Sequence, residues 1–136
     1  MTRLAVFTCL FFLVIYHGFG VNPGLCEEKC PLVVTDWSPK DWKECLRPLI
    51  SAKYRSGCGI DIDISSIRMF LDDHLVTPTI TESDSEIIVT YMATSDLQDD
   101  MNHFVRVFAK DVMGTEGEKT WSWLIPSGYG FVPDCP

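Results

Sequence analysis

After residue 30, hydrophobic and polar residues alternate in short runs that are rich in β-branched and aromatic side chains and end at Asp, Gly, Ser or Pro. This pattern is typical of antiparallel strands that bury one face and are separated by polar turns. The runs that predict strands are 31–35, 48–54, 66–72, 75–80, 86–91, 103–109 and 119–124. About seven strands at turn spacings of roughly 8–12 residues predict an all-β sandwich.

The alternation also predicts which side chains face the core, because successive residues of a strand point to opposite faces. The inward set is Ile50, Ala52, Tyr54, Ile67, Met69, Leu71, Ile87, Val89, Tyr91, Val105, Val107, Ala109, Trp121 and Trp123. Between the strands, we expect turns over 36–41 and 82–84, a helical turn or irregular link over 42–47, and a loop over 55–64.

The first twenty residues have a different pattern. Arg3 precedes an apolar run over 4–16, and Gly18 and Gly20 occupy the −3 and −1 positions of a cleavage site. These features predict a secretory signal peptide over 1–20, since the run is too short for a membrane span. We therefore expect an arm over 21–30, one domain over 31–125 and a tail over 126–136, in a chain that is secreted or held at the cell surface.

The chain carries a formal net charge of −8. This charge argues against nucleic acid and anionic membrane surfaces as partners, because their phosphates require Lys and Arg. It is compatible with cationic partners or with a divalent metal.

Five of the six cysteines follow the predicted signal peptide, and exported cysteines usually form disulfides. Alternating strand directions would place Cys58 near Cys26 and Cys30, and Cys45 near Cys135. We therefore predict a Cys45–Cys135 bond and a bond from Cys58 to either Cys26 or Cys30. The odd count leaves one cysteine free, paired with another chain, or capped.

A succession of short motifs covers about residues 31–125. In order, the motifs are Ser38-Pro39-x-Asp41, Arg47-Pro48-x-Ile50-Ser51-Ala52, Gly57-x-Gly59-Ile60-Asp61, Ser65-Ser66-Ile67-Arg68-x-x-Leu71-Asp72, Val76-Thr77, Val89-Thr90-Tyr91, His103-x-Val105-x-Val107-x-Ala109-x-Asp111-x-x-Gly114 and Thr120-Trp121-Ser122. This succession resembles bacterial immunoglobulin-like (Big or fibronectin-III-like) domains.

The resemblance implies a seven-stranded immunoglobulin-like sandwich that spaces, presents or binds in exported adhesins, surface-layer proteins and polysaccharide-processing enzymes, and that is not a catalyst. The chain departs from the family in standing alone, in its five cysteines and in an added Asp-Ile pair within 60–63. A lone domain does not suit a purely structural spacer, because a spacer needs neighbours.

Motifs for catalysis are missing from the sequence: it has no Gly-x-Ser-x-Gly elbow, phosphate loop or His-Glu-x-x-His helix. After the signal peptide the only histidines are His74 and His103, and we expect neither to pair with a cysteine. The sequence therefore predicts a protein that is not an enzyme and has no cofactor apart from calcium.

The calcium hypothesis rests on three acidic loops that strand direction would bring to one pole. Calcium takes six to eight oxygen ligands from such flexible loops. The candidate ligands are Asp61, Asp63, Asp111 and Glu116, with Glu82 and Asp84 on the neighbouring loop. The alternative is a solvated acidic rim.

A partner-binding face is predicted from the outward side chains of two neighbouring strands. If Val105 and Val107 face the core, their neighbours in sequence face away from it. The predicted face comprises Arg68, Phe70, Phe104, Arg106 and Phe108. Aromatic residues and Arg are enriched at the centres of interfaces. The alternative is that the tail segment 129–132 folds back over this face, held by Cys135.

These observations predict a non-enzymatic binding or adhesion domain with a protein or glycan partner at a cell surface. The alternatives are a small secreted effector or host-interacting factor on the same sandwich, and a carbohydrate-binding accessory module. A dimer through the same face, or through an unpaired cysteine, is a further alternative. Trp37 and Trp42, near the first turn, would stack on a sugar or cover one end of the sandwich.

Overall fold

The computed structural model describes residues 30–41, 45–83 and 86–128. These residues form eight strands and no helix: β1 (Leu32–Ser38), β2 (Leu49–Ser56), β3 (Ile62–Leu71), β4 (His74–Val76), β5 (Thr79–Ser83), β6 (Glu86–Met92), β7 (Met101–Asp111) and β8 (Glu116–Ile125). Among the described residues, no helix has the length and apolar character needed to cross a membrane.

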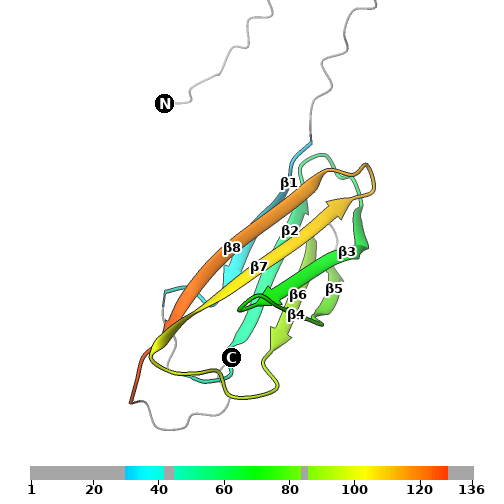
Figure 1. The fold of residues 1–136 in the computed structure, drawn as a ribbon. Coiled ribbons are helices and arrows are strands. Elements are labelled where there is room, and N and C mark those ends of the chain that lie inside the picture. Colours follow the sequence, from blue (N-terminus) through cyan, green and yellow to red (C-terminus); the bar gives the residue numbers. More distant parts are fainter. Residues whose placement is uncertain (1–29, 42–44, 84–85, 129–136) are drawn as a thin grey trace, which may run out of the picture.

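The strands form two antiparallel sheets of four, in the orders β1-β2-β6-β5 and β4-β3-β7-β8. Figure 1 shows the β8, β7 and β3 ribbons in front of the other sheet. This division of strands is that of an immunoglobulin-like sandwich, so the predicted fold class is confirmed. The predicted strand over 75–80 is two strands, because the chain crosses between the sheets at Thr77 and Pro78.

The core lies between the two sheets and confirms the predicted inward residues, except that Tyr91 is only partly buried. Ile50, Ala52 and Tyr54 contribute from β2, and Val105, Val107 and Ala109 contribute from β7. The indole rings of Trp121 and Trp123 are buried as well. The period of two in the sequence thus determined which face of each strand became apolar and buried.

The first strand is longer than predicted. A turn was expected over 36–41, but β1 continues to Ser38 after a register shift between Val34 and Asp36. The shift places the Trp37 ring against the core, with the Lys119 ammonium 3.9 Å from the ring centroid. Trp37 therefore covers one edge of the sandwich, whereas Trp42 lies outside the described residues.

The third strand also differs from the prediction, since part of the expected 55–64 loop belongs to it. Its pairing with β7 is interrupted between Asp63 and Arg68. The Ser66 hydroxyl replaces the missing ladder bonds: it accepts a hydrogen bond from the Lys110 amide (2.7 Å) and donates one to the Asp63 carbonyl (2.6 Å).

One disulfide joins Cys30 to Cys58, as one of the two alternatives predicted. It ties the start of β1 to the connection between β2 and β3. Cys45 is also disulfide-bonded, and its predicted partner, Cys135, lies outside the described residues, as does Cys26.

Candidate functional site

The outer face of the β4-β3-β7-β8 sheet carries the residues of the predicted partner-binding face. One row crosses all four strands: Leu75 pairs with Phe70, Phe70 with Arg106, and Arg106 with Thr120. Cross-strand partners point to the same face of a sheet. Leu75, which the sequence analysis did not include, is 62% exposed and extends the apolar surface onto β4.

The five predicted residues differ in their exposure and in their contacts. Phe104 is 54% exposed, while Phe70 and Phe108 are half-buried. The Arg106 guanidinium carbon lies 4.6 Å from the centroid of the Phe70 ring, and the Lys110 ammonium lies 5.7 Å from that of Phe108. Phe104 therefore offers the most accessible aromatic surface of the five.

Arg68 is engaged by its own strand. Its guanidinium donates hydrogen bonds of 2.7 Å to both the Ser65 and the Ile67 carbonyl oxygens. These carbonyls belong to the interrupted part of β3, so Arg68 satisfies backbone groups that the ladder leaves open. The Arg68 guanidinium is therefore less available to a partner than that of Arg106.

A pocket of about 610 Å³ opens beside Phe104 and Arg106. Its walls come from the β3–β4 turn, the β6–β7 connection and the outer face of β7. The volume lies within the range of roughly 300–1,000 Å³ that is usual for small-molecule sites.

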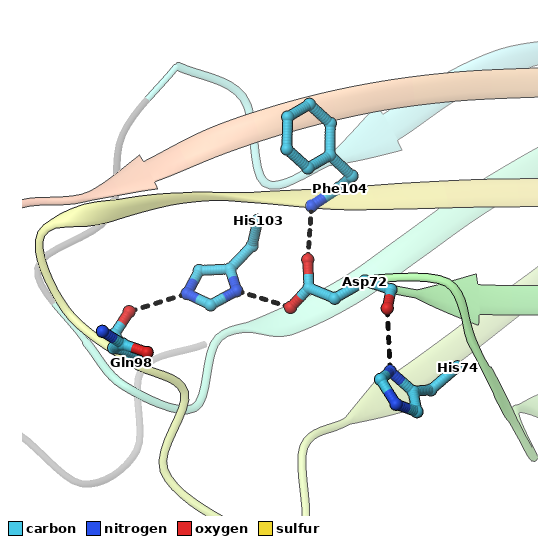
Figure 2. A network of polar contacts seen from close by, with 5 residues as sticks. All are labelled: Asp72, His74, Gln98, His103 and Phe104. Carbon is cyan, nitrogen blue, oxygen red and sulfur yellow. Dashed lines mark hydrogen bonds and ion pairs between the residues drawn. The ribbon is translucent and has the colours of Figure 1, made fainter.

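A buried histidine joins two of these walls. His103 is 2% exposed; its Nδ1 lies 2.7 Å from Asp72 Oδ2, and its Nε2 lies 2.7 Å from the Gln98 carbonyl oxygen (Figure 2). Figure 2 also shows the Phe104 ring on the opposite side of β7 from the His103 ring. The two ring nitrogens of His103 therefore link the β3–β4 turn to the β6–β7 connection.

The Asp72 side chain extends the pairing of β3 with β7 beyond the last paired residue. Its Oδ1 accepts a hydrogen bond from the Phe104 amide (2.8 Å), while its own amide donates to the Phe104 carbonyl (2.9 Å). Asp72 and Asp73 form the two-residue connection to β4 with φ of 49° and 64°. Positive φ at both positions is the requirement of a type I′ hairpin, which Asp tolerates better than most residues.

The polar groups that line the pocket fall into two sets. Asp72 is bound to His103, and Asp96 to the Arg47 side chain at 2.6 Å. By contrast, the Asp73 carboxylate and the N–H groups of Arg106 make no hydrogen bond or ion pair within the described part of the chain. One carboxylate and one guanidinium thus remain open to a ligand.

Of the four residues proposed for calcium, Asp63, Asp111 and Glu116 have carboxylates that already contact other groups of the chain. The Asp111 carboxylate accepts hydrogen bonds from the Met113 and Thr115 amides, and Glu116 is paired with Lys110. Asp63 accepts from Ser65, while Asp61 and Glu82 line a second pocket of about 320 Å³. No group of three acidic, His or Cys side chains in the described ranges could hold a metal ion; Asp84 lies outside those ranges.

Asp72 and His103 appear among the sequence motifs without a predicted role in the site, and Asp73 was not singled out. A signal for the turn exists, because two Asp residues separate two strand-like runs. No local signal reveals the His103 contacts, since its acceptors lie 31 residues before it and five residues before it. The alternative covering segment, 129–132, lies outside the described residues.

A scan against protein-family models finds no match, and a search of curated proteins finds no significant relative. The resemblance to bacterial immunoglobulin-like domains therefore stays a prediction from the motifs.

Proposed function

We propose that this chain is an exported, non-enzymatic binding or adhesion domain. Its binding surface is the outer face of the β4-β3-β7-β8 sheet, and its partner is a protein or glycan at a cell surface. The observation that carries the proposal is the exposure of Phe104 beside Arg106 and the pocket of about 610 Å³.

The composition of this face supports a binding role. Water-facing strands usually carry small polar or charged side chains, but here Leu75, Phe70, Phe104 and Phe108 point outward from neighbouring strands. Contiguous apolar surface of this kind marks interaction sites. Arg and aromatic side chains are also the residues that dominate binding energy at interfaces.

The Cys30–Cys58 disulfide supports export, because disulfides persist in oxidising compartments outside the cytosol. It agrees with the signal peptide expected over residues 1–20.

The polar network beside the pocket supports binding over catalysis. Asp72 and His103 resemble an acid–base pair, but both ring nitrogens of His103 already have partners inside the protein. A general base needs a nitrogen within hydrogen-bond reach of the substrate proton. His103 has none to offer, so the pair serves to hold the pocket walls.

The test is an array of purified extracellular proteins and glycans, probed with the chain lacking residues 1–20. We expect binding that Phe104→Thr and Arg106→Gln each abolish and that Met113→Thr retains. Met113 is a matched control, since it is an exposed apolar residue in the turn at the other end of β7. Binding that survives both face substitutions would place the site elsewhere, and an array without any bound partner would contradict a binding role.

A further inference from the structure

We infer that the pocket beside Phe104 binds one ring of a neutral saccharide. This inference rests on the proposed function and specifies its partner class. The observations that carry it are the balance of free charges in the pocket, the exposed aromatic ring and the bracing of the pocket walls.

The free charges of the pocket balance one another. The Asp72 carboxylate already has His103 Nδ1 as a partner, and the Asp96 carboxylate is paired with Arg47. Asp73 and Arg106 remain, and no ion pair joins them. An anion would be attracted by Arg106 but repelled by the Asp73 carboxylate. A cation would be attracted by Asp73 but repelled by Arg106. A ligand whose hydroxyl groups both donate and accept can satisfy the two together without a net charge.

The position of the Arg106 side chain fits the same ligand. Its guanidinium carbon lies 4.6 Å from the centroid of the Phe70 ring, and its N–H groups make no hydrogen bond or ion pair within the described residues, so they remain for acceptors. These donors have a fixed fork geometry that suits two neighbouring oxygens. Vicinal hydroxyls of a sugar ring present such a pair. Thr120 lies next to Arg106 in the same cross-strand row and adds a hydroxyl to the pocket wall.

Phe104 provides an apolar contact for the ring itself. The C–H groups on the face of a pyranose are weakly positive, and the face of an aromatic ring is negative. With more than half of its surface exposed at the pocket wall, Phe104 can receive such a ring. Asn102, two residues earlier on the same face of β7, adds an amide that can donate and accept.

The pocket is also held in shape before any ligand arrives. His103 joins the β3–β4 turn to the β6–β7 connection through Asp72 and Gln98. Weak ligands such as sugars bind usefully only where the site does not have to be ordered first. A protein partner would not need such a pocket, because protein interfaces draw on larger areas.

The test is an NMR titration of the isotope-labelled chain with the methyl glycosides of glucose, galactose, mannose and N-acetylglucosamine, each at millimolar concentration. Glucuronate and a Lys-rich peptide serve as charged competitors. We expect at least one neutral glycoside to shift the signals of Asp73, Asn102 and Arg106. Phe104→Thr and Arg106→Lys should each weaken this binding by roughly tenfold, while Met113→Thr should leave it unchanged.

Three outcomes would overturn the inference: no glycoside shifts these signals, a charged competitor binds the pocket more tightly than every neutral glycoside, or the shifts map outside the pocket. If the array still shows a protein partner that Phe104→Thr abolishes, the proposed function stands and only the saccharide is wrong. If Phe104→Thr changes binding in neither the array nor the NMR titration, the proposed face itself is wrong.

Discussion

At the scale of single residues, Tyr54 and His103 are buried polar side chains in opposite situations. Both ring nitrogens of His103 have hydrogen-bond partners, whereas the Tyr54 hydroxyl is buried without a partner among the described residues. A buried polar group without a partner costs about 1–3 kcal/mol, and one with partners stabilises the fold slightly. Substitutions at the two sites should therefore act in opposite directions.

We expect Tyr54→Phe to raise the free energy of unfolding by about 1 kcal/mol at neutral pH, because it removes a hydroxyl that has lost its water contacts. Chemical denaturation of the two proteins measures the difference. A decrease of similar size would show that the hydroxyl has a stabilising partner.

The same substitution should change the response to alkali. Burial, with a smaller effect from the charge of Glu118, raises the pKa of the Tyr54 hydroxyl above its ordinary value. The unfolded chain then releases this proton at a lower pH than the folded protein. The stability from keeping Tyr54 neutral is complete below about pH 10 and declines above it, by up to about 1.36 kcal/mol per pH unit. The free energy of unfolding of Tyr54→Phe should therefore decline less above about pH 10 than that of the unsubstituted protein.

Asp72→Ala tests the network around His103. The substitution leaves the Phe104 amide and His103 Nδ1 without their acceptor. Asp73→Ala is the matched control, since Asp73 has similar positive φ in the same turn but no carboxylate hydrogen bond in the described structure. We expect Asp72→Ala to lower the free energy of unfolding by about 1–3 kcal/mol more than Asp73→Ala. Equal losses of unfolding free energy in the two variants would mean that Asp72 contributes through its backbone conformation and not through its carboxylate.

At the scale of elements, β1 and β8 meet at a position that only glycine can occupy. A Cβ atom on Gly117 would lie 2.7 Å from the Leu32 carbonyl oxygen and 2.8 Å from Leu32 Cγ. Gly117→Ala should therefore force the strands apart and destabilise the protein by about 1–3 kcal/mol. Ser122→Ala, at an exposed position of β8, is the control and should change stability by no more than about 0.5 kcal/mol. Similar melting temperatures for the two variants would contradict the close packing of β1 on β8.

The elements also show how far the sequence determines the structure. In β7, strict alternation predicted both the buried Val105 and Val107 and the outward Phe104 and Arg106, because a strand has a period of two. The extension of β1 through Trp37 escaped prediction, because Asp, Ser and Pro around it form a turn-like sequence and the register shift reverses the alternation.

The candidate site divides in the same way. Its outward aromatic residues follow from strand periodicity alone, and their placement on neighbouring strands follows from strand order. The pocket does not, because its walls depend on contacts between distant segments: Asp72 with His103, and Asp96 with Arg47. The Arg68 contacts were missed for another reason, since they arise from the interruption of β3 that no periodic pattern shows.

At the scale of the whole molecule, the Cys30–Cys58 bond closes a loop across a sequence separation of 28 residues. A loop of that length is worth on the order of 3 kcal/mol in lost entropy of the unfolded chain. The double variant Cys30→Ala/Cys58→Ala avoids leaving a single thiol and should lose about that much free energy of unfolding. A loss below about 1 kcal/mol would mean that the terminal strand is held by packing alone.

The central claim is that the chain leaves the outer face of the β4-β3-β7-β8 sheet open for a partner. The melting temperature of Phe104→Thr tests it most directly, because threonine keeps the strand preference while removing the ring. Val107→Thr, at a fully buried position of the same strand, defines the effect expected of a covered residue.

For an open face, Phe104→Thr should cost less than about 1 kcal/mol, which corresponds to a fall of no more than roughly 4–8 °C in a domain of this size. If another part of the chain, such as the segment 129–132, covers the face, the loss of unfolding free energy in Phe104→Thr should match or exceed that in Val107→Thr. The substitution would then bury an unpaired hydroxyl and leave a cavity where the aromatic ring was, and both effects destabilise the fold. A fall as large as that of Val107→Thr would contradict the account.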